Sequence, residues 1–154
     1  MTKVTVLVAV CNASHYLPDC LSSLMEQSLS DIQVVCVDDA STDDSLSLLL
    51  QYARRDRRIE VVSLPENQGQ GHARNIGLKM ARGEYVCFLD ADDWLEHDAL
   101  ERCVSVFAEH EDTDSVLFSV SMDYADHAEP YVLPAFDRLT GEEAFRMSLS
   151  WQIH

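Results

Sequence analysis

The stretch that decides the fold is Asn67–Leu95, NQGQGHARNIGLKMARGEYVCFLDADDWL. It reads as a glycine-opened loop, a helix that ends at an arginine and a glycine, and an apolar strand over Tyr85–Leu89. Such a short apolar run predicts a strand covered on both faces. An acidic cluster, Asp90, Asp92 and Asp93, follows it directly. Carboxylates crowded at the end of a buried strand favour a bound cation, and oxygen ligands suit Mg2+ or Mn2+ carried with a substrate's phosphates. The first hypothesis is therefore a metal–nucleotide site.

Composition restricts the class of partner. The 154 residues are enough for a single domain with a real core, and 47% of them are hydrophobic. The formal net charge of −16 argues against nucleic acid or an anionic membrane as a partner. The five cysteines show no CxxC spacing, which favours free thiols in a reducing cytoplasm. The first apolar run, Val4–Val10, is too short to span a membrane.

The order of elements predicts an α/β fold. Four apolar runs are expected to be strands: Val4–Val10, Ile32–Val37, Ile59–Leu64 and Tyr85–Leu89. Amphipathic helical patterns follow each of them. This alternation predicts a Rossmann-like, doubly wound, mostly parallel sheet in a three-layer α/β/α arrangement. Further along, a strand is expected over Ser115–Met122 and an irregular stretch or weak hairpin over Asp123–Asp137. A capping box at Thr140–Glu143 predicts a last helix.

Polar side chains follow three of the predicted strands where each strand ends. Asn12 follows the first, Asp38 and Asp39 follow the second, and the Asp90–Asp93 cluster follows the fourth. Ligands of doubly wound sheets bind outside the carboxyl ends of the strands, so these clusters are expected to meet at one site. Each also has a simpler explanation, because Asp and Asn favour turns and helix caps. Gly69–Arg74 is either a helix start alone or a helix start that lies near a phosphate.

Two other known motifs match the sequence only in part. Gly69-x-Gly71 with Asp90 downstream mimics a dinucleotide-binding fingerprint, but Arg74 stands where the third glycine belongs. The segment Phe88–Asp92 resembles the aspartyl-phosphate motif of haloacid-dehalogenase-type phosphatases, which would make Asp90 a nucleophile. That family carries the motif on its first strand, whereas here it follows the fourth. A phosphotransferase or phosphatase using Asp90 stays open as an alternative at this point, as does a non-catalytic binding module.

Three blocks together carry a family resemblance: VTVLVAVCNASHYLPDCLSSLMEQS, VVCVDDASTDDS and the Asn67–Leu95 stretch. They resemble the nucleotide-sugar-binding half of the family-2 glycosyltransferases with the GT-A fold, and the likeness covers nearly the whole chain. The resemblance implies metal-assisted, inverting transfer of a sugar from a nucleoside diphosphate donor, commonly a UDP-sugar. The acceptor would be a hydroxyl of a saccharide or of a lipid-linked saccharide.

The resemblance also implies roles for single residues. Asp39 is expected to hold the nucleoside base, Arg74 to lie against the base or the diphosphate, and Asp90 to contact the ribose or sugar. Asp92 is expected to ligate Mg2+ or Mn2+. Asn12, at the end of the first strand, completes the set of candidate donor-binding residues. The family usually has Pro-x-Tyr-Asn at that strand end, whereas this chain has Ala9–Asn12, AVCN, and so lacks the aromatic residue.

No residue of this chain matches the family's catalytic base. The base is therefore expected beyond His154, and residues 1–154 are interpreted as a single donor-binding domain from a longer enzyme. A cytoplasmic location is expected, with membrane contact only through other parts of the parent chain.

Overall fold

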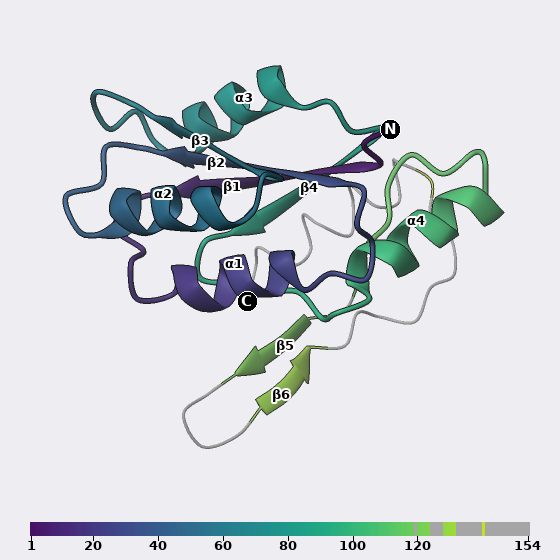
Figure 1. The fold of residues 1–154 in the computed structure, drawn as a ribbon. Coiled ribbons are helices and arrows are strands. Elements are labelled where there is room, and N and C mark those ends of the chain that lie inside the picture. The colour runs from purple at the N-terminus through teal and green to yellow at the C-terminus, as the bar shows by residue number, and fades with distance from the viewer. Residues whose placement is uncertain (119, 124–127, 132–139, 141–154) are drawn as a thin grey trace. The chain divides into compact units, whose positions relative to one another are not determined.

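A computed structural model describes residues 1–118, 120–123, 128–131 and 140 (Figure 1). The chain divides into two compact units, residues 1–113 and the part from Asp114 onward. The first unit contains the predicted α/β alternation, and the described part of the second contains a pair of short strands. The two units are therefore described separately.

The first unit is built on a four-stranded parallel sheet. Its strands are β1 (Val4–Val10), β2 (Ile32–Asp38), β3 (Ile59–Ser63) and β4 (Tyr85–Asp90). Their order in the sheet is β3-β2-β1-β4, with every neighbouring pair parallel. The register pairs Val10 of β1 with Asp38 of β2, and Ala9 of β1 with Asp90 of β4. The predicted parallel α/β sheet is confirmed, and its carboxyl ends gather at one edge.

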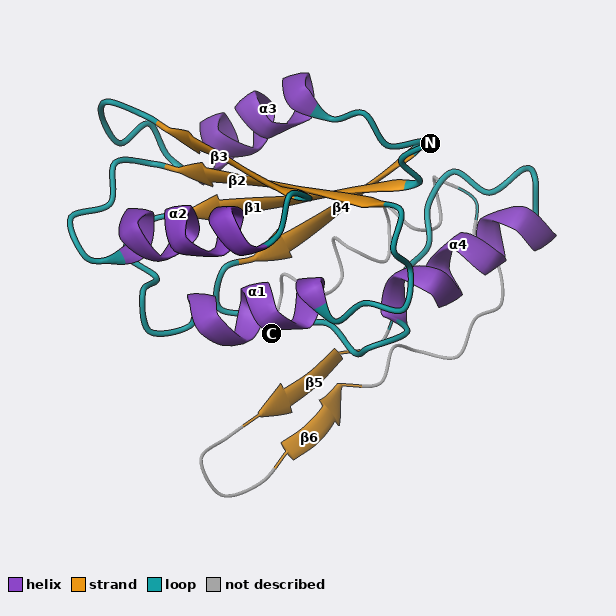
Figure 2. Cartoon of the chain, in the orientation of Figure 1, coloured by secondary structure: helices purple, strands orange, loops and turns teal. Residues whose placement is uncertain are grey.

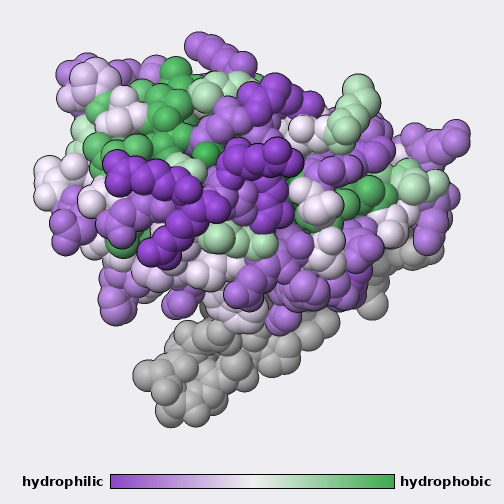
Figure 3. Space-filling model, viewed as in Figure 1, coloured by the Kyte–Doolittle hydropathy of each residue, from purple (hydrophilic) through white to green (hydrophobic). Residues whose placement is uncertain are grey.

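Helices cover both faces of the sheet, as Figure 2 shows. They are α1 (Leu17–Met25), α2 (Ser45–Arg55), α3 (Gln70–Met80) and α4 (Ala99–Glu109). One core cluster joins β1, β2 and β4 to α1, α2 and α4, through buried residues such as Leu21, Leu49 and Leu100. A smaller cluster joins β1 and β2 to α3 through Leu7, Val35 and Ala73. The three predicted layers are thereby confirmed. On the face of the molecule that Figure 3 shows, most of the surface is hydrophilic.

The prediction that β4 is covered on both faces was wrong. Leu89 is buried, but the residues before it alternate between partly buried and exposed, and Val86 and Phe88 are 40% and 49% exposed. The cause is the strand order. Helix α3 packs against β1 and β2, with buried Ala73 against Leu7 and its neighbours. Because β4 is the last strand of the four, the face that it shares with α3 extends past the helix.

A buried polar cluster fixes the amino ends of the strands. Thr5 and Gln33 are paired in the β1–β2 register and are both buried. The Thr5 hydroxyl donates to Gln33 Oε1 at 2.8 Å, and Thr5 Oγ1 accepts the N–H groups of Arg82 at 3.2 Å and Gly83 at 2.9 Å. A side chain at Gly83 would place Cβ 2.5 Å from the backbone nitrogen of Thr5. Only glycine therefore fits where the chain enters β4.

The second unit contains an antiparallel pair, β5 (Val120–Asp123) and β6 (Ala128–Tyr131). A hairpin was one of the two outcomes expected for this region. The predicted strand over Ser115–Met122 was wrong at its start, because residues 115–118 form no regular structure. The strand extends only as far as its partner pairs with it, from Val120 opposite Tyr131 to Asp123 opposite Ala128. The predicted last helix lies outside the described residues.

No helix in the described part of the chain is both long and apolar enough to cross a membrane.

Candidate functional site

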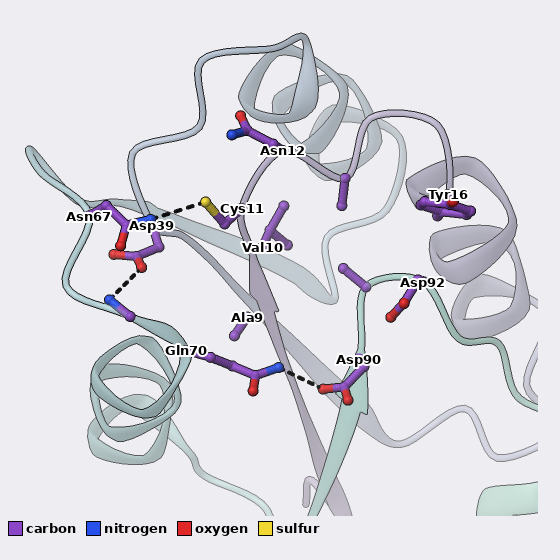
Figure 4. A pocket seen from close by; sticks show the side chains of 13 residues that line it. Ala9, Val10, Cys11, Asn12, Tyr16, Asp39, Asn67, Gln70, Asp90 and Asp92 are labelled. Carbon is purple, nitrogen blue, oxygen red and sulfur yellow. Dashed lines mark hydrogen bonds between the residues drawn. The ribbon is translucent and has the colours of Figure 1, made fainter.

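A pocket opens at the carboxyl ends of β1, β2 and β4, with a volume of about 400 Å3. Four of the five candidate residues line it, namely Asn12, Asp39, Asp90 and Asp92. The fifth, Arg74, lies outside the lining. Figure 4 shows Asp39, Asn67 and Cys11 gathered on one side of the pocket, with Asp92 and Tyr16 away from them. The remaining lining residues are Ala9, Val10, Ala13, Gly69, Gln70 and Ala91.

Asp39 is buried and pins the start of α3 to the end of β2. Its Oδ1 accepts the N–H of Gln68 at 2.8 Å, and its Oδ2 accepts the N–H of Gly69 at 2.7 Å. Gly69 has a φ of 88°, in the left-handed region that favours glycine. The carboxylate thus fixes the position of the loop that precedes α3. Each oxygen keeps a further lone pair, so this engagement leaves Asp39 able to accept one more donor from a ligand.

Asn12 joins the loop after β1 to the loop after β2. Its Oδ1 accepts the N–H groups of Thr42 at 2.8 Å and Asp43 at 3.3 Å, and its own N–H donates to Ser41 Oγ at 3.0 Å. Its φ is 54°, which asparagine tolerates better than most residues. The side chain therefore works as a turn residue, as the simpler interpretation held, while also lining the pocket.

Asp43 completes this connection between the two loops. Its Oδ2 accepts the N–H of Ser14 at 3.0 Å, and its Oδ1 accepts the N–H of Ser45 at 2.9 Å. Hydrogen bonds, first from the Ser45 side chain and then from the backbone N–H groups of Ser14 and Ser45, hold the pKa of Asp43 well below its ordinary value. Buried Ser45 accepts the N–H of Ala13 at 2.9 Å. The pocket wall at this end is thus ordered by the chain itself.

Asp38 lies next to Asp39 but outside the pocket lining. It is buried, and its Oδ2 accepts the Ser63 hydroxyl at 3.3 Å, while its Oδ1 has no hydrogen-bond partner among the described residues. Successive residues of a strand face opposite sides of a sheet. Of the two adjacent aspartates, only Asp39 therefore belongs to the pocket.

Asp90, Arg74 and Gln70 form one contact between β4 and α3. Arg74 Nη2 donates to Asp90 Oδ1 at 2.6 Å, and Gln70 Nε2 donates to the same oxygen at 3.0 Å. The ion pair is partly exposed on both sides. The structure thus brings Arg74 to the site through Asp90. Because both donors use one oxygen of Asp90, the other oxygen stays available to the pocket.

Asp92 and Asp93 differ in position. Asp92 is exposed at the pocket wall, and no hydrogen bond to its carboxylate is found among the described residues. Asp93 lies outside the lining, and burial raises its pKa, with further contributions from the charges of Asp92 and Asp90. A cation near these carboxylates would relieve that repulsion. Among the described residues, no group of three or more His, Cys, Asp or Glu is arranged to hold a metal.

Three polar lining residues were not predicted from the sequence: Cys11, Tyr16 and Asn67. Gln70, which also lines the pocket, lies in the Gly69–Arg74 segment, for which a position near a phosphate was one of the two interpretations. Asn67 Nδ2 donates to Cys11 Sγ at 3.1 Å, so a thiol and an amide occupy the strand end where the family's aromatic residue is missing. The sequence did offer a signal for Cys11, because this residue stands where the family usually has a tyrosine. Tyr16, 51% exposed just before α1, gave no signal because its position depends on the path of a loop.

A protein-family model matches most of the chain. The family model described as "Glycosyl transferase family 2" matches residues 5–143. The chain belongs to glycosyl transferase family 2. The suspected resemblance is thereby confirmed, and the alternative of a phosphatase with Asp90 as nucleophile loses its support.

Individual proteins similar to this chain support the assignment. The chain is 38% identical over 123 residues to the "Putative glycosyltransferase EpsH" of Bacillus subtilis, covering 80% of this chain and 35% of that protein. It superposes with a TM-score of 0.67 and 35% identity on S. aureus TarS 1-349 in complex with UDP, covering 71% and 33% of the two chains. It superposes with a TM-score of 0.64 and 33% identity on the mannosyltransferase PcManGT from Pyrobaculum calidifontis in complex with GDP-Man and Mn2+, covering 69% and 32%. The chain thus spans about a third of the length of each of these relatives.

Proposed function

We propose that this chain binds a nucleoside diphosphate sugar, a UDP-sugar in the first instance, together with Mg2+ or Mn2+. The observation that carries the proposal is the pocket itself. One of its sides is ordered by Asp39 and the start of α3, and elsewhere in its wall stands Asp92, an exposed carboxylate without a hydrogen bond from the described residues.

The nucleoside is assigned to the side with Asp39, Cys11 and Asn67. Asp39 lies at the end of β2 and its carboxylate can accept a further donor, such as a ring N–H of a base. The amide of Asn67 offers both a donor and an acceptor, and its Nδ2 already donates to Cys11. UDP in a TarS complex and GDP-Man in the PcManGT complex support a nucleotide here.

The diphosphate is assigned to the space between the start of α3 and Asp92. Gly69 and Gln70 line the pocket, and a helix N-terminus favours negative charge. A cation held by one carboxylate takes its remaining ligands from phosphate and water, which is the usual arrangement for Mg2+. When bound, such a cation would neutralise charge that develops on the departing diphosphate. Mn2+ in the PcManGT complex supports this assignment.

The proposal extends to the reaction of the whole enzyme. The whole enzyme is proposed to transfer the sugar, with inversion, to a hydroxyl of a saccharide or lipid-linked saccharide acceptor during polysaccharide synthesis. The relatives include a poly(ribitol-phosphate) beta-glucosyltransferase, a chondroitin synthase and a teichoic acid poly(glycerol phosphate) polymerase. A cytoplasmic location is part of the proposal and agrees with five free cysteines.

Calorimetric titration of the chain with UDP, with and without Mn2+, tests the proposal. We expect binding that tightens at least about ten-fold with Mn2+, and Asp92→Ala should remove that gain without lowering the melting temperature. A parallel titration with GDP compares the two bases seen in the relatives. Wild-type chain that takes up neither nucleotide in either condition would refute the proposal.

Asp44→Ala is the matched control for Asp92→Ala. Asp44 is also exposed, its side chain makes no capping hydrogen bond, and it is not part of the pocket lining. The variant changes the net charge by the same amount, so it measures the general effect of charge on nucleotide binding. We expect its response to Mn2+ to match that of the wild type.

A further inference from the structure

Phe88 presents an aromatic ring beside the pocket without lining it. It lies on the exposed part of β4 and, two residues before Asp90, shares a sheet face with it. The guanidinium of Arg74 lies over this ring, with Cζ 5.8 Å from the ring centroid. This distance is within the range of a cation–π contact. Phe88 thus touches the residue that holds Asp90.

The packing of α3 explains why Arg74 reaches this position. A Cβ built on Gly77 would lie 3.1 Å from Cδ2 of Leu7, so the helix lies close against β1 at this point. Leu7 is the register partner of Phe88 on the neighbouring strand. Arg74 is three residues before Gly77 and therefore lies close to it on the helix surface. From there its side chain extends over β4, where it meets Phe88 and Asp90 together.

We propose that Phe88 is a positioning residue for the nucleotide pocket, acting through Arg74. A planar guanidinium can stack on a ring and donate in its own plane to a carboxylate, so the two contacts of Arg74 support each other. The ring restricts an otherwise flexible side chain, and this restriction keeps Asp90 Oδ1 occupied and the Asp90 side chain aimed at the pocket. The inference rests on the proposed function, because its effect is on nucleotide binding.

Substitution of Phe88 in the 154-residue chain tests the inference. With Mn2+ present, Phe88→Leu should weaken UDP binding about two- to five-fold, the range expected for loss of an exposed cation–π contact. Phe88→Tyr keeps a ring and should bind like the wild type. Val86→Ala is the matched control: Val86 is 40% exposed on the same face of β4, offers no ring, and should leave UDP binding unchanged. Unchanged melting temperatures would separate positioning from folding.

A double substitution identifies the route of the effect. In an Arg74→Gln background, Phe88→Leu should produce no further loss, because the ring then has no cation to position. A full additional loss would overturn the inference, as would wild-type affinity in Phe88→Leu alone. In both of those results the wild type still binds UDP and the proposed function stands. Absence of UDP binding by the wild type refutes the proposed function, and the inference falls with it.

Discussion

The loop after β2, residues 39–44, and the loop after β4, residues 91–95, each bring an aspartate to one pocket. In the first loop, Asp39 and Asp43 each accept two backbone N–H groups from the chain. In the second loop, Asp92 is exposed without such a partner among the described residues, and the pKa of Asp93 is raised. Identical side chains thus differ in their surroundings: Asp39 and Asp43 order the chain through backbone N–H groups, whereas Asp92 lines the pocket without such a partner among the described residues.

The largest expected effect is on stability, from Asp39→Ala. The substitution leaves the N–H groups of Gln68 and Gly69 without their acceptor, and we expect a loss of about 3 kcal/mol in the free energy of unfolding. Urea unfolding followed by circular dichroism measures it. Asp39→Asn, which keeps one acceptor, should lose less. If Asp39→Ala proved as stable as Asp92→Ala, the contrast between the two loops would be refuted.

Acid should weaken the first loop through Asp43. Its pKa in the folded chain lies below the ordinary value of 3.8, so its stabilising effect is complete above that value and lost as the pH falls through the folded pKa. We therefore expect Asp43→Asn to be clearly less stable than the wild type at pH 6 and closer to it at pH 2, because the loss begins below pH 3.8 and is complete only below the folded pKa. The measurement is urea unfolding of both proteins at the two pH values. A difference that stays constant with pH would contradict the assignment.

A gain in stability is expected at Ala40. Its φ of 54° lies in the left-handed region, where alanine is strained and glycine is not. Ala40→Gly should raise the free energy of unfolding by about 0.5–1 kcal/mol. Thermal unfolding detects such a gain as a higher melting temperature. Ala53→Gly, within α2, is the control and should lower it, because glycine weakens a helix interior.

The smallest effect is expected at Asp93. A raised pKa in the folded chain means that the stability contributed by its proton is present at low pH and lost as the pH rises through that pKa. At pH 7, Asp93→Asn should therefore gain a few tenths of a kcal/mol, since Asp93 is only partly removed from the solvent that screens its charge. We expect Mn2+ to reduce the difference by relieving the repulsion in the wild type. A less stable Asp93→Asn variant would show that this carboxylate supports its loop after all.

The sequence was sufficient to predict the parallel sheet and the edge of the sheet at which the polar side chains gather. Apolar runs marked the four strands, and the rule for parallel sheets brought Asn12, Asp39 and Asp90 together at one edge. The exposed face of β4 was missed because Tyr85–Leu89 is apolar whatever covers it; its exposure depends on strand order. The acceptor role of Asp39 was missed, and the turn role expected for Asn12 came without its partners. In both cases the donors are distant backbone N–H groups, which no side-chain pattern reveals.

The buried pair of Thr5 and Gln33 has a consequence for how the pocket can vary. The pocket lies about 16 Å away along β1, at roughly 3.3 Å per residue. A slip of one residue between β1 and β2 would turn every side chain of the moved strand to the opposite face, so the facing of Asp39 depends on an alignment held at the far end. Recognition and alignment are thus separate tasks at opposite ends of the strands. Under the proposed function, we expect substitutions at Cys11, Tyr16 or Asn67 to change which donor the pocket prefers without disturbing the alignment of the strands.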